Sequence, residues 1–285
     1  MRFITYRTAE GEGVGIAADG GYRGRPVQVL GRDLKGALHD GQALAALGRE
    51  LAGAPLLDMD DIELLAPIPR PDKIICVGLN YADHSAESGF EVPTYPTVFA
   101  RFASSLVGHG AAMVRPAASD LFDYEGELVA VIGKGGRHIG RAQALDHVAG
   151  YSLFNDGSVR DFQIRTPQWT MGKAFDGTGA FGPELVTPDE LPEGCKGLTL
   201  TVRLNGEVMQ CASTDDLIFG IADLVATLSE AMTLAPGDVI VTGTPGGVGA
   251  MRKPPVWLKP GDICTVEMDR IGTLSNPVRQ EAVPV

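Results

Sequence analysis

Short runs of apolar, β-branched and aromatic residues recur along the chain, and such runs are typical of strands. The first two, at residues 2–7 and 14–17, are followed by the turn sequence Asp19-Gly20-Gly21. The later runs predict strands at 73–78, 97–102, 125–133, 150–155, 198–204, 238–243 and 263–268. The chain is therefore expected to consist mostly of sheet.

Two segments have helical periodicity instead. Residues 33–51 repeat leucine at nearly helical spacing, although glycines interrupt the pattern. Residues 216–232 carry one apolar face and follow three residues that can cap a helix, Ser213, Thr214 and Asp215. Because strands outnumber helices, we expect an α+β fold with a mixed or antiparallel sheet and with helices packed on the outside.

Turn residues divide the chain further. Asn205-Gly206 predicts a type I′ hairpin between 198–204 and the next apolar run. The prolines at 67, 69 and 71 indicate a linker. We therefore expect a small N-terminal α/β domain over residues 1–69 and a main domain over residues 70–285.

Composition narrows the classes of partner. The 285 residues are 44% hydrophobic and carry a formal charge of −12, with no basic run, so nucleic acid is not an expected partner. An anionic substrate would need a locally positive site, such as a bound cation. No segment reads as a signal peptide or a membrane span, which predicts a cytoplasmic protein without a membrane partner. Four scattered cysteines suggest neither zinc nor disulfides and are expected to be small core residues.

The strongest chemical signal is a set of carboxylates. Glu125 and Glu127 are two apart on a predicted strand, so they share a face and repel each other unless a cation lies between them. Alone, the pair could equally be a solvated strand face. Asp156 adds a third carboxylate at the end of another predicted strand, without histidine or cysteine nearby. This set favours Mg²⁺, Mn²⁺ or Ca²⁺ over zinc.

Three other segments could take part in chemistry. If residues 81–87 form a helical turn, His84 and Glu87 meet as a general-base pair, or as an ordinary surface pair. Lys173 stands among apolar and glycine residues, where it could hold a substrate anion or extend to the surface. The glycine-rich segment 237–249, with Thr244, could wrap a ligand but matches no nucleotide-binding motif.

Taken in order, six motifs resemble the fumarylacetoacetate hydrolase family over nearly all of residues 70–285. They are GLNYADHSAE, FDYEGELVAVIGK, GYSLFNDGSVRDFQ, WTMGKAFDGTGAFGP, LNGEVMQ and GDVIVTGTPGGVG. The resemblance implies a mixed β-roll with flanking helices, a homodimer, and a Mg²⁺ or Mn²⁺ site, with Ca²⁺ also possible.

The resemblance also assigns roles to residues. Glu125, Glu127 and Asp156 would bind the metal, His84 and Glu87 would activate water, and Lys173 would stabilise substrate charge. Contacts to the substrate's carboxylate and carbonyl oxygens would come from Arg160, Gln163 and Thr244.

One position departs from the family. Many members have lysine in a FxK pattern where this chain has Phe99-Ala100-Arg101. The arginine offers a two-pronged fork in place of a point charge. We expect Arg101 to border a polar or acidic substrate tail.

These roles imply cleavage of the carbon–carbon bond of a small 2,4-dioxo acid, such as an acylpyruvate or a diketo-deoxy sugar acid. Water activated by His84 and Glu87 would attack C4, and pyruvate enolate and a carboxylic acid would leave. The nearest alternative is decarboxylation of oxaloacetate, followed by isomerisation or hydration of an unsaturated 2-oxo acid, because all pass through an enolate. A non-catalytic scaffold is disfavoured, since His84, Glu87 and Lys173 are all present.

Overall fold

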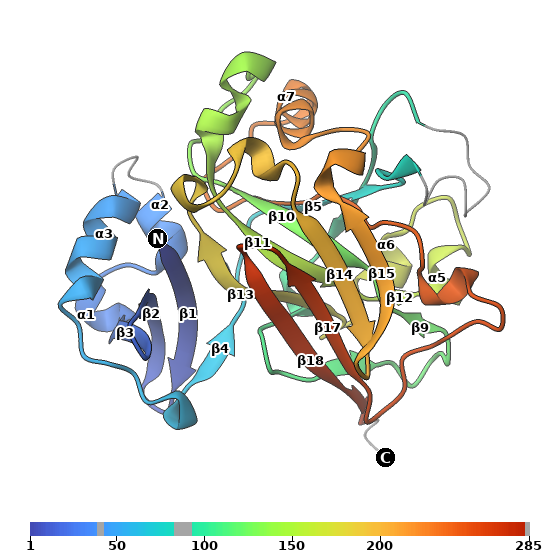
Figure 1. Ribbon diagram of the computed structural model, residues 1–285, viewed down its shortest axis with the longest axis horizontal. Helices are drawn as coiled ribbons and strands as arrows, with labels where there is room; N and C mark the ends of the chain where they lie inside the picture. The colour runs from blue at the N-terminus through green and yellow to red at the C-terminus, as the bar shows by residue number, and fades with distance from the viewer. Residues whose placement is uncertain (39–42, 83–92, 283–285) are drawn as a thin grey trace.

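The computed structural model describes residues 1–38, 43–82 and 93–282. Two packed sheets form the framework of the described chain (Figure 1). The strands are β1 (Arg2–Thr8), β2 (Gly11–Ala18), β3 (Gly21–Pro26), β4 (Glu63–Leu65), β5 (Ile74–Gly78), β6 (Thr97–Arg101), β7 (Leu106–Val107), β8 (Met113–Arg115), β9 (Phe122–Asp123), β10 (Gly126–Ile132), β11 (Val148–Asp156), β12 (Ser158–Val159), β13 (Gly179–Val186), β14 (Thr199–Leu204), β15 (Glu207–Ser213), β16 (Val239–Val241), β17 (Ile263–Met268) and β18 (Gly272–Gln280).

Helices are short and few in the described residues. The α-helices are α1 (Val27–Leu30), α2 (Leu34–Leu38), α3 (Ala43–Ala52), α5 (Arg160–Gln163), α6 (Thr170–Lys173) and α7 (Ile221–Ala231). The 3₁₀ segments are η1 (Met59–Asp61), η2 (Ala103–Ser105), η3 (Arg141–His147), η4 (Pro188–Glu190), η5 (Glu193–Cys195), η6 (Thr214–Asp216) and η7 (Gly249–Met251). None of the described helices is long and apolar enough to cross a membrane.

The larger sheet has the order β3-β2-β1-β13-β11-β10-β16-β5-β6, with β4 on β1 and β7 on β13. Most neighbours are antiparallel, while β16–β5 and β13–β7 are parallel. The second sheet has the order β15-β14-β17-β18-β8, and β9 pairs separately with β12. The expected α+β class with mixed sheet is confirmed.

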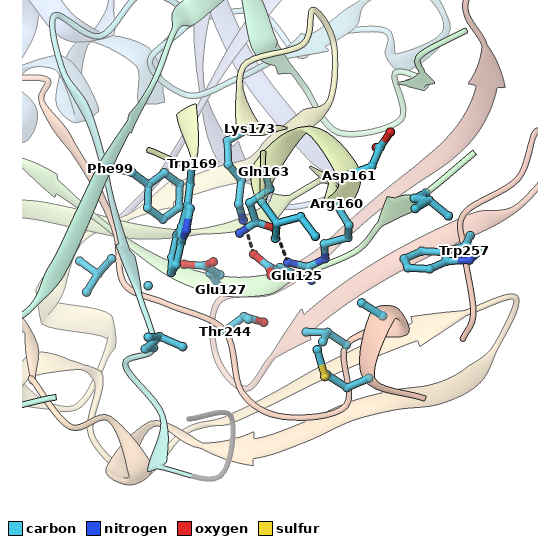
Figure 2. A pocket seen from close by; sticks show the side chains of 18 residues that line it. Phe99, Glu125, Glu127, Arg160, Asp161, Gln163, Trp169, Lys173, Thr244 and Trp257 are labelled. Atoms are coloured by element: carbon cyan, nitrogen blue, oxygen red, sulfur yellow. Dashed lines mark hydrogen bonds and ion pairs between the residues drawn. The ribbon is translucent and has the colours of Figure 1, made fainter. Parts of the chain in front are cut away.

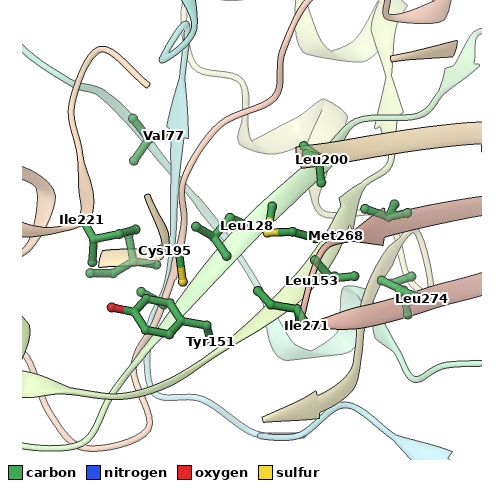
Figure 3. Close-up of a cluster of buried hydrophobic side chains, with 14 of the residues drawn as sticks. Val77, Leu128, Tyr151, Leu153, Cys195, Leu200, Ile221, Met268, Ile271 and Leu274 are labelled. Atoms are coloured by element: carbon green, nitrogen blue, oxygen red, sulfur yellow. The ribbon is translucent and has the colours of Figure 1, made fainter. Parts of the chain in front are cut away.

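Alternating side chains of β10 separate two apolar cores, because successive residues of a strand face opposite sides. Leu128 and Ile132 contribute to the core under the second sheet, which also contains Leu200 of β14 and residues of α7 (Figure 3). Val129 and Val131 contribute to the other core, which contains Phe3 of β1 and the apolar faces of α2 and α3. A central strand that is buried on both faces is the reason for the continuous apolar run in the sequence.

The N-terminal segment shares this larger sheet, since β1 pairs with β13 through Arg2↔Val186 and Phe3↔Leu185. The boundary near residue 70 remains a prediction. The predicted hairpin is confirmed: Asn205 and Gly206 both have positive φ, as a type I′ turn requires, and connect β14 to β15.

The predicted helix ends were partly wrong. Where one helix was expected over 33–51, the described residues form α2 and α3, and residues 39–42 lie outside the description. The second helix begins at Ile221, not at 216, because the backbone before it is bonded elsewhere: the amide of Ile218 donates to the carbonyl of Asn80. Ser213 caps η6 instead. Cys211 is exposed, contrary to the expected core position, whereas the other three cysteines are buried.

Candidate active site

The three predicted metal-binding carboxylates converge. β10 and β11 are antiparallel neighbours with Gly126 opposite Asn155, and the amide of Asp156 donates to the carbonyl of Glu125 at 2.8 Å. This register sets Asp156 beside the Glu125–Glu127 pair. One carboxylate oxygen from each of the three residues lies within 4.8 Å of the others, and all three side chains are buried.

The chemistry of this group fits a hard divalent cation. Burial, and then the negative charges of Asp156 and Glu125, raise the pKa of Glu127 well above its usual range. The charge of Lys173 lowers the pKa but does not outweigh these causes, so the group still favours further positive charge. A cation with oxygen ligands, of the Mg²⁺ or Mn²⁺ kind, would supply it.

Lys173, at the end of α6, reaches the same group. Its Nζ donates to Glu125 Oε2 at 2.5 Å and to Asp156 Oδ2 at 2.6 Å, and only 1% of the side chain is exposed. The ring of Phe99 lies 5.1 Å from this Nζ. Burial lowers the pKa of Lys173, but the neighbouring Asp156 and Glu125 outweigh it and leave the pKa raised. The ammonium is therefore charged and held at the carboxylates, not extended to the surface.

The position of Arg101 does not match the expected substrate contact. Its guanidinium is fully buried, pairs with Asp156 Oδ1, and donates to the carbonyl of Gly157 at 3.1 Å and to Thr178 Oγ1 at 2.8 Å. It is not among the residues that line the cavity described below. Arg101 thus lies behind Asp156, because β6 directs this side chain inward. Arg101 pairs with Oδ1 of Asp156, while Oδ2 faces Lys173.

Arg101→Met is expected to lower the free energy of unfolding by about 3 kcal/mol, because it leaves the buried Asp156 short of a partner. Arg203→Met is the control, since its ion pair with Glu267 is more than one third exposed and is expected to contribute less than about 1 kcal/mol. Urea unfolding measures both. Equal losses in the two variants would contradict a structural role for Arg101.

Arg160 lies on the other side of Glu125. Its Nη2 is 2.7 Å from Glu125 Oε1 and 2.7 Å from Asp123 Oδ2, and its Nη1 donates to Gln163 Oε1 at 2.9 Å. Glu125 is thus bracketed by Lys173 and Arg160. Arg160 and Gln163, two of the predicted substrate-binding side chains, line the cavity, and α5 brings them together one helical turn apart.

Thr244 also lines the cavity, but its hydroxyl has partners within the protein. It donates to the carbonyl of Gly126 at 2.9 Å and accepts from Gln210 Nε2 at 2.9 Å. Gln210 Oε1 in turn accepts from the amide of Gly126 at 3.1 Å. A Cβ at Gly126 would come within 2.2 Å of Val202 on β14, so glycine is required between the two glutamates.

The carboxylates open into a cavity of about 380 Å³. Figure 2 shows Glu125, Glu127, Lys173 and Arg160 directed toward one space, with Phe99 and Trp169 on one side and Trp257 at the far side. A cavity with an apolar wall and a few convergent charges is the usual form of a small-molecule site.

His84 and Glu87 lie outside the described residues, so their pairing remains a prediction. The sequence analysis gave no role to two buried side chains that organise the site, Asp123 and Gln210. Both lie inside the family motifs, but a position on a strand does not show which groups of another sheet a side chain contacts.

Comparison with known proteins bears on this site directly. Residues 73–279 match the family described as "Fumarylacetoacetate (FAA) hydrolase C-terminal". The chain belongs to the fumarylacetoacetate hydrolase family. It is therefore an enzyme of that family, and the resemblance inferred from the six motifs is confirmed.

Among its relatives in the family, the human protein "Oxaloacetate tautomerase FAHD2A, mitochondrial" is 40% identical over 288 residues, covering 98% of this chain and 91% of that protein. "Oxaloacetate tautomerase YisK" of Bacillus subtilis is 42% identical over 253 residues, covering 84% of each. The maleylpyruvate hydrolase of Sphingobium sp. SYK-6, solved with manganese(II) and pyruvate, matches with a TM-score of 0.81 at 29% identity, over 99% of this chain and 100% of that one. Family members of this fold thus include an isomerising enzyme and a hydrolase.

Proposed function

We propose that this enzyme interconverts the keto and enol forms of oxaloacetate with the aid of Mg²⁺ or Mn²⁺. The observation that carries the proposal is the group of Glu125, Glu127 and Asp156, bracketed by two cationic side chains at the cavity. The two relatives named oxaloacetate tautomerase agree with it. This proposal replaces the hydrolase as the first choice and belongs with the alternatives derived from the sequence.

The reaction asks little of the protein beyond charge and proton placement. One proton leaves C3 and one reaches the 2-oxo oxygen, while every carbon–carbon bond stays intact. A bound cation supplies a Lewis acid for the 2-oxo oxygen. Lys173 Nζ is buried and charged, so it stabilises negative charge that develops beside the carboxylates. His84 with Glu87, which the sequence predicts as a pair that activates water, would here carry the C3 proton.

Oxaloacetate also suits the two cations of the cavity. It has a carboxylate at each end, and Lys173 and Arg160 approach Glu125 from opposite oxygens, Oε2 and Oε1. Two separated positive charges can therefore meet the two ends of a short dianion. The net charge of −12 over the whole chain makes a local group of cations necessary for anion capture.

The test is a direct assay of the enol. With Mn²⁺ present, the ultraviolet absorbance of freshly dissolved enol-oxaloacetate should decay faster as enzyme concentration rises, without matching release of pyruvate. Pyruvate is followed in parallel by coupling to lactate dehydrogenase and NADH. Stoichiometric pyruvate would indicate the decarboxylase instead, and an unchanged rate of enol decay would rule out the tautomerase.

Hydrolysis of a 2,4-dioxo acid is the second candidate. Its support is the maleylpyruvate hydrolase structure with manganese(II) and pyruvate. Acylpyruvates, diketo-deoxy sugar acids and maleylpyruvate belong in the same pyruvate-release assay. The hydrolase becomes the better proposal if kcat/KM for any of them exceeds that for the oxaloacetate enol.

Other features of the proposal rest on the sequence. We expect a homodimer, with no nucleic acid or membrane partner. A cytoplasmic location was expected as well, whereas the human relative carries "mitochondrial" in its name. Fractionation of the source cells would decide the compartment for this chain.

A further inference from the structure

The carboxylate of Asp123 joins two walls of the cavity. Its Oδ1 accepts from the amides of Tyr124 and Gly249, both at 2.8 Å. Its Oδ2 accepts from the amide of Ala250 at 2.9 Å and from Arg160 Nε at 2.8 Å, and Arg160 Nη2 lies 2.7 Å away. Asp123 is fully buried and is not itself part of the cavity wall, whereas Arg160 and Ala250 are.

We propose that Asp123 is a positioning residue for substrate recognition, fixing Arg160 and the turn Gly249–Met251 in one arrangement. The inference rests on the proposed function in one respect, that Arg160 faces a 2-oxo acid. Asp123 acts through Arg160 and the turn, and it touches neither metal nor substrate.

Hydrogen-bond chemistry makes the carboxylate hard to replace. Every group around Asp123 is a donor: three backbone amides and two nitrogens of Arg160. An asparagine at this position would place its own N–H group next to one of these donors. A buried donor without an acceptor lowers the stability of that arrangement. The turn packs closely here, since a Cβ on Gly249 would lie 1.9 Å from the carbonyl oxygen of Val256 and 2.5 Å from Asp123 Oδ1.

The same geometry limits what Arg160 offers. Nε and Nη2 are directed to Asp123 and Glu125, while Nη1 bonds Gln163 on the cavity wall. Asp123 therefore leaves the Nη1 side of the fork, together with the Gln163 amide, as the part that meets an anion. Displacing Arg160 from Asp123 would disturb this pair of contacts while Glu125, Glu127 and Asp156 all remain.

The experiment compares Asp123→Asn with the parent by calorimetric titration of pyruvate at saturating Mn²⁺, after the Mn²⁺ affinity of each protein is measured. We expect pyruvate to bind about tenfold more weakly, and KM for oxaloacetate to rise more than kcat falls. Asp238→Asn is the matched control. That carboxylate is equally buried and accepts from two backbone amides and Lys73 Nζ, but it does not line the cavity. Its pyruvate affinity should stay within about twofold of the parent.

A double-mutant cycle separates positioning from general loosening. In an Arg160→Met background, Asp123→Asn should weaken pyruvate binding by clearly less than tenfold, because only its contacts to the turn remain to be lost. Unchanged affinity in Asp123→Asn alone, or the full loss in both backgrounds, would overturn the inference.

If Asp123→Asn does not fold while Asp238→Asn does, Arg160→Lys replaces it, because one ammonium cannot span Asp123, Glu125 and Gln163. The same tenfold loss is then expected, and parental affinity would overturn the inference. Pyruvate binding needs no turnover. A parent protein that binds pyruvate but leaves the oxaloacetate enol untouched would refute the proposed function and not the role of Asp123.

Discussion

Removal of divalent metal is expected to abolish turnover of the oxaloacetate enol, and Mg²⁺ or Mn²⁺ should restore it. Three buried carboxylates within 4.8 Å of one another cannot act on a dianion without added positive charge. The measurement is the enol assay in EDTA, followed by titration of each metal. Full activity in chelator, from protein shown by elemental analysis to contain no metal, would remove the metal from the proposal.

Glu127→Gln tests the ligand itself. The amide keeps an acceptor for the amide of Gly243, which bonds Glu127 Oε2 at 2.5 Å, but it removes the charge. Mn²⁺ affinity, measured by electron paramagnetic resonance, should fall at least about tenfold. Glu184→Gln is the control, because Glu184 is also buried but pairs with Arg2 away from the cavity. Equal Mn²⁺ affinity in both variants would exclude Glu127 as a ligand.

Lys173→Met should change catalysis and metal binding in opposite directions. We expect kcat to fall about 10²- to 10³-fold, the usual effect of removing one donor that stabilises developing negative charge. Mn²⁺ should bind more tightly, because the ammonium that competes for Glu125 and Asp156 is gone.

Lys73→Met is the control for this variant. The ammonium of Lys73 pairs with Asp238, and neither residue lines the cavity. Both kcat and Mn²⁺ affinity should remain near parental values there. Weaker Mn²⁺ binding in Lys173→Met, with kcat unchanged, would mean that Lys173 only supports the ligands.

The metal-binding group could be predicted because it depends on local pattern. Residues two apart on a strand share a face. Asp156 is the last residue of β11, which pairs with β10, the strand that begins directly after Glu125. The hairpin at Asn205-Gly206 followed in the same way from the need for positive φ. Such features require only the period of the strand and the chemistry of a turn.

The roles of Arg101 and Asp123 could not be predicted in this way. Nothing in the sequence near Arg101 shows that its strand lies three positions from β10 in the sheet, beyond β16 and β5, and turns the guanidinium toward Asp156. Asp123 meets a turn more than 120 residues later in the chain. The predicted start of α7 was wrong for a similar reason. The residues before the helix donate hydrogen bonds to Asn80 and not to the next helical turn.

The glycine between the two glutamates ties the chemistry to the interior of the protein. Because Gly126 packs against Val202 while Gln210 holds its amide, the spacing between β14 and β10 sets where both neighbouring carboxylates stand. A substitution at Val202 is therefore expected to shift the carboxylates of Glu125 and Glu127 without altering either residue. Divergence of activity among proteins that keep the same acidic residues has, in this layer, a physical route that comparison of active-site motifs alone would overlook.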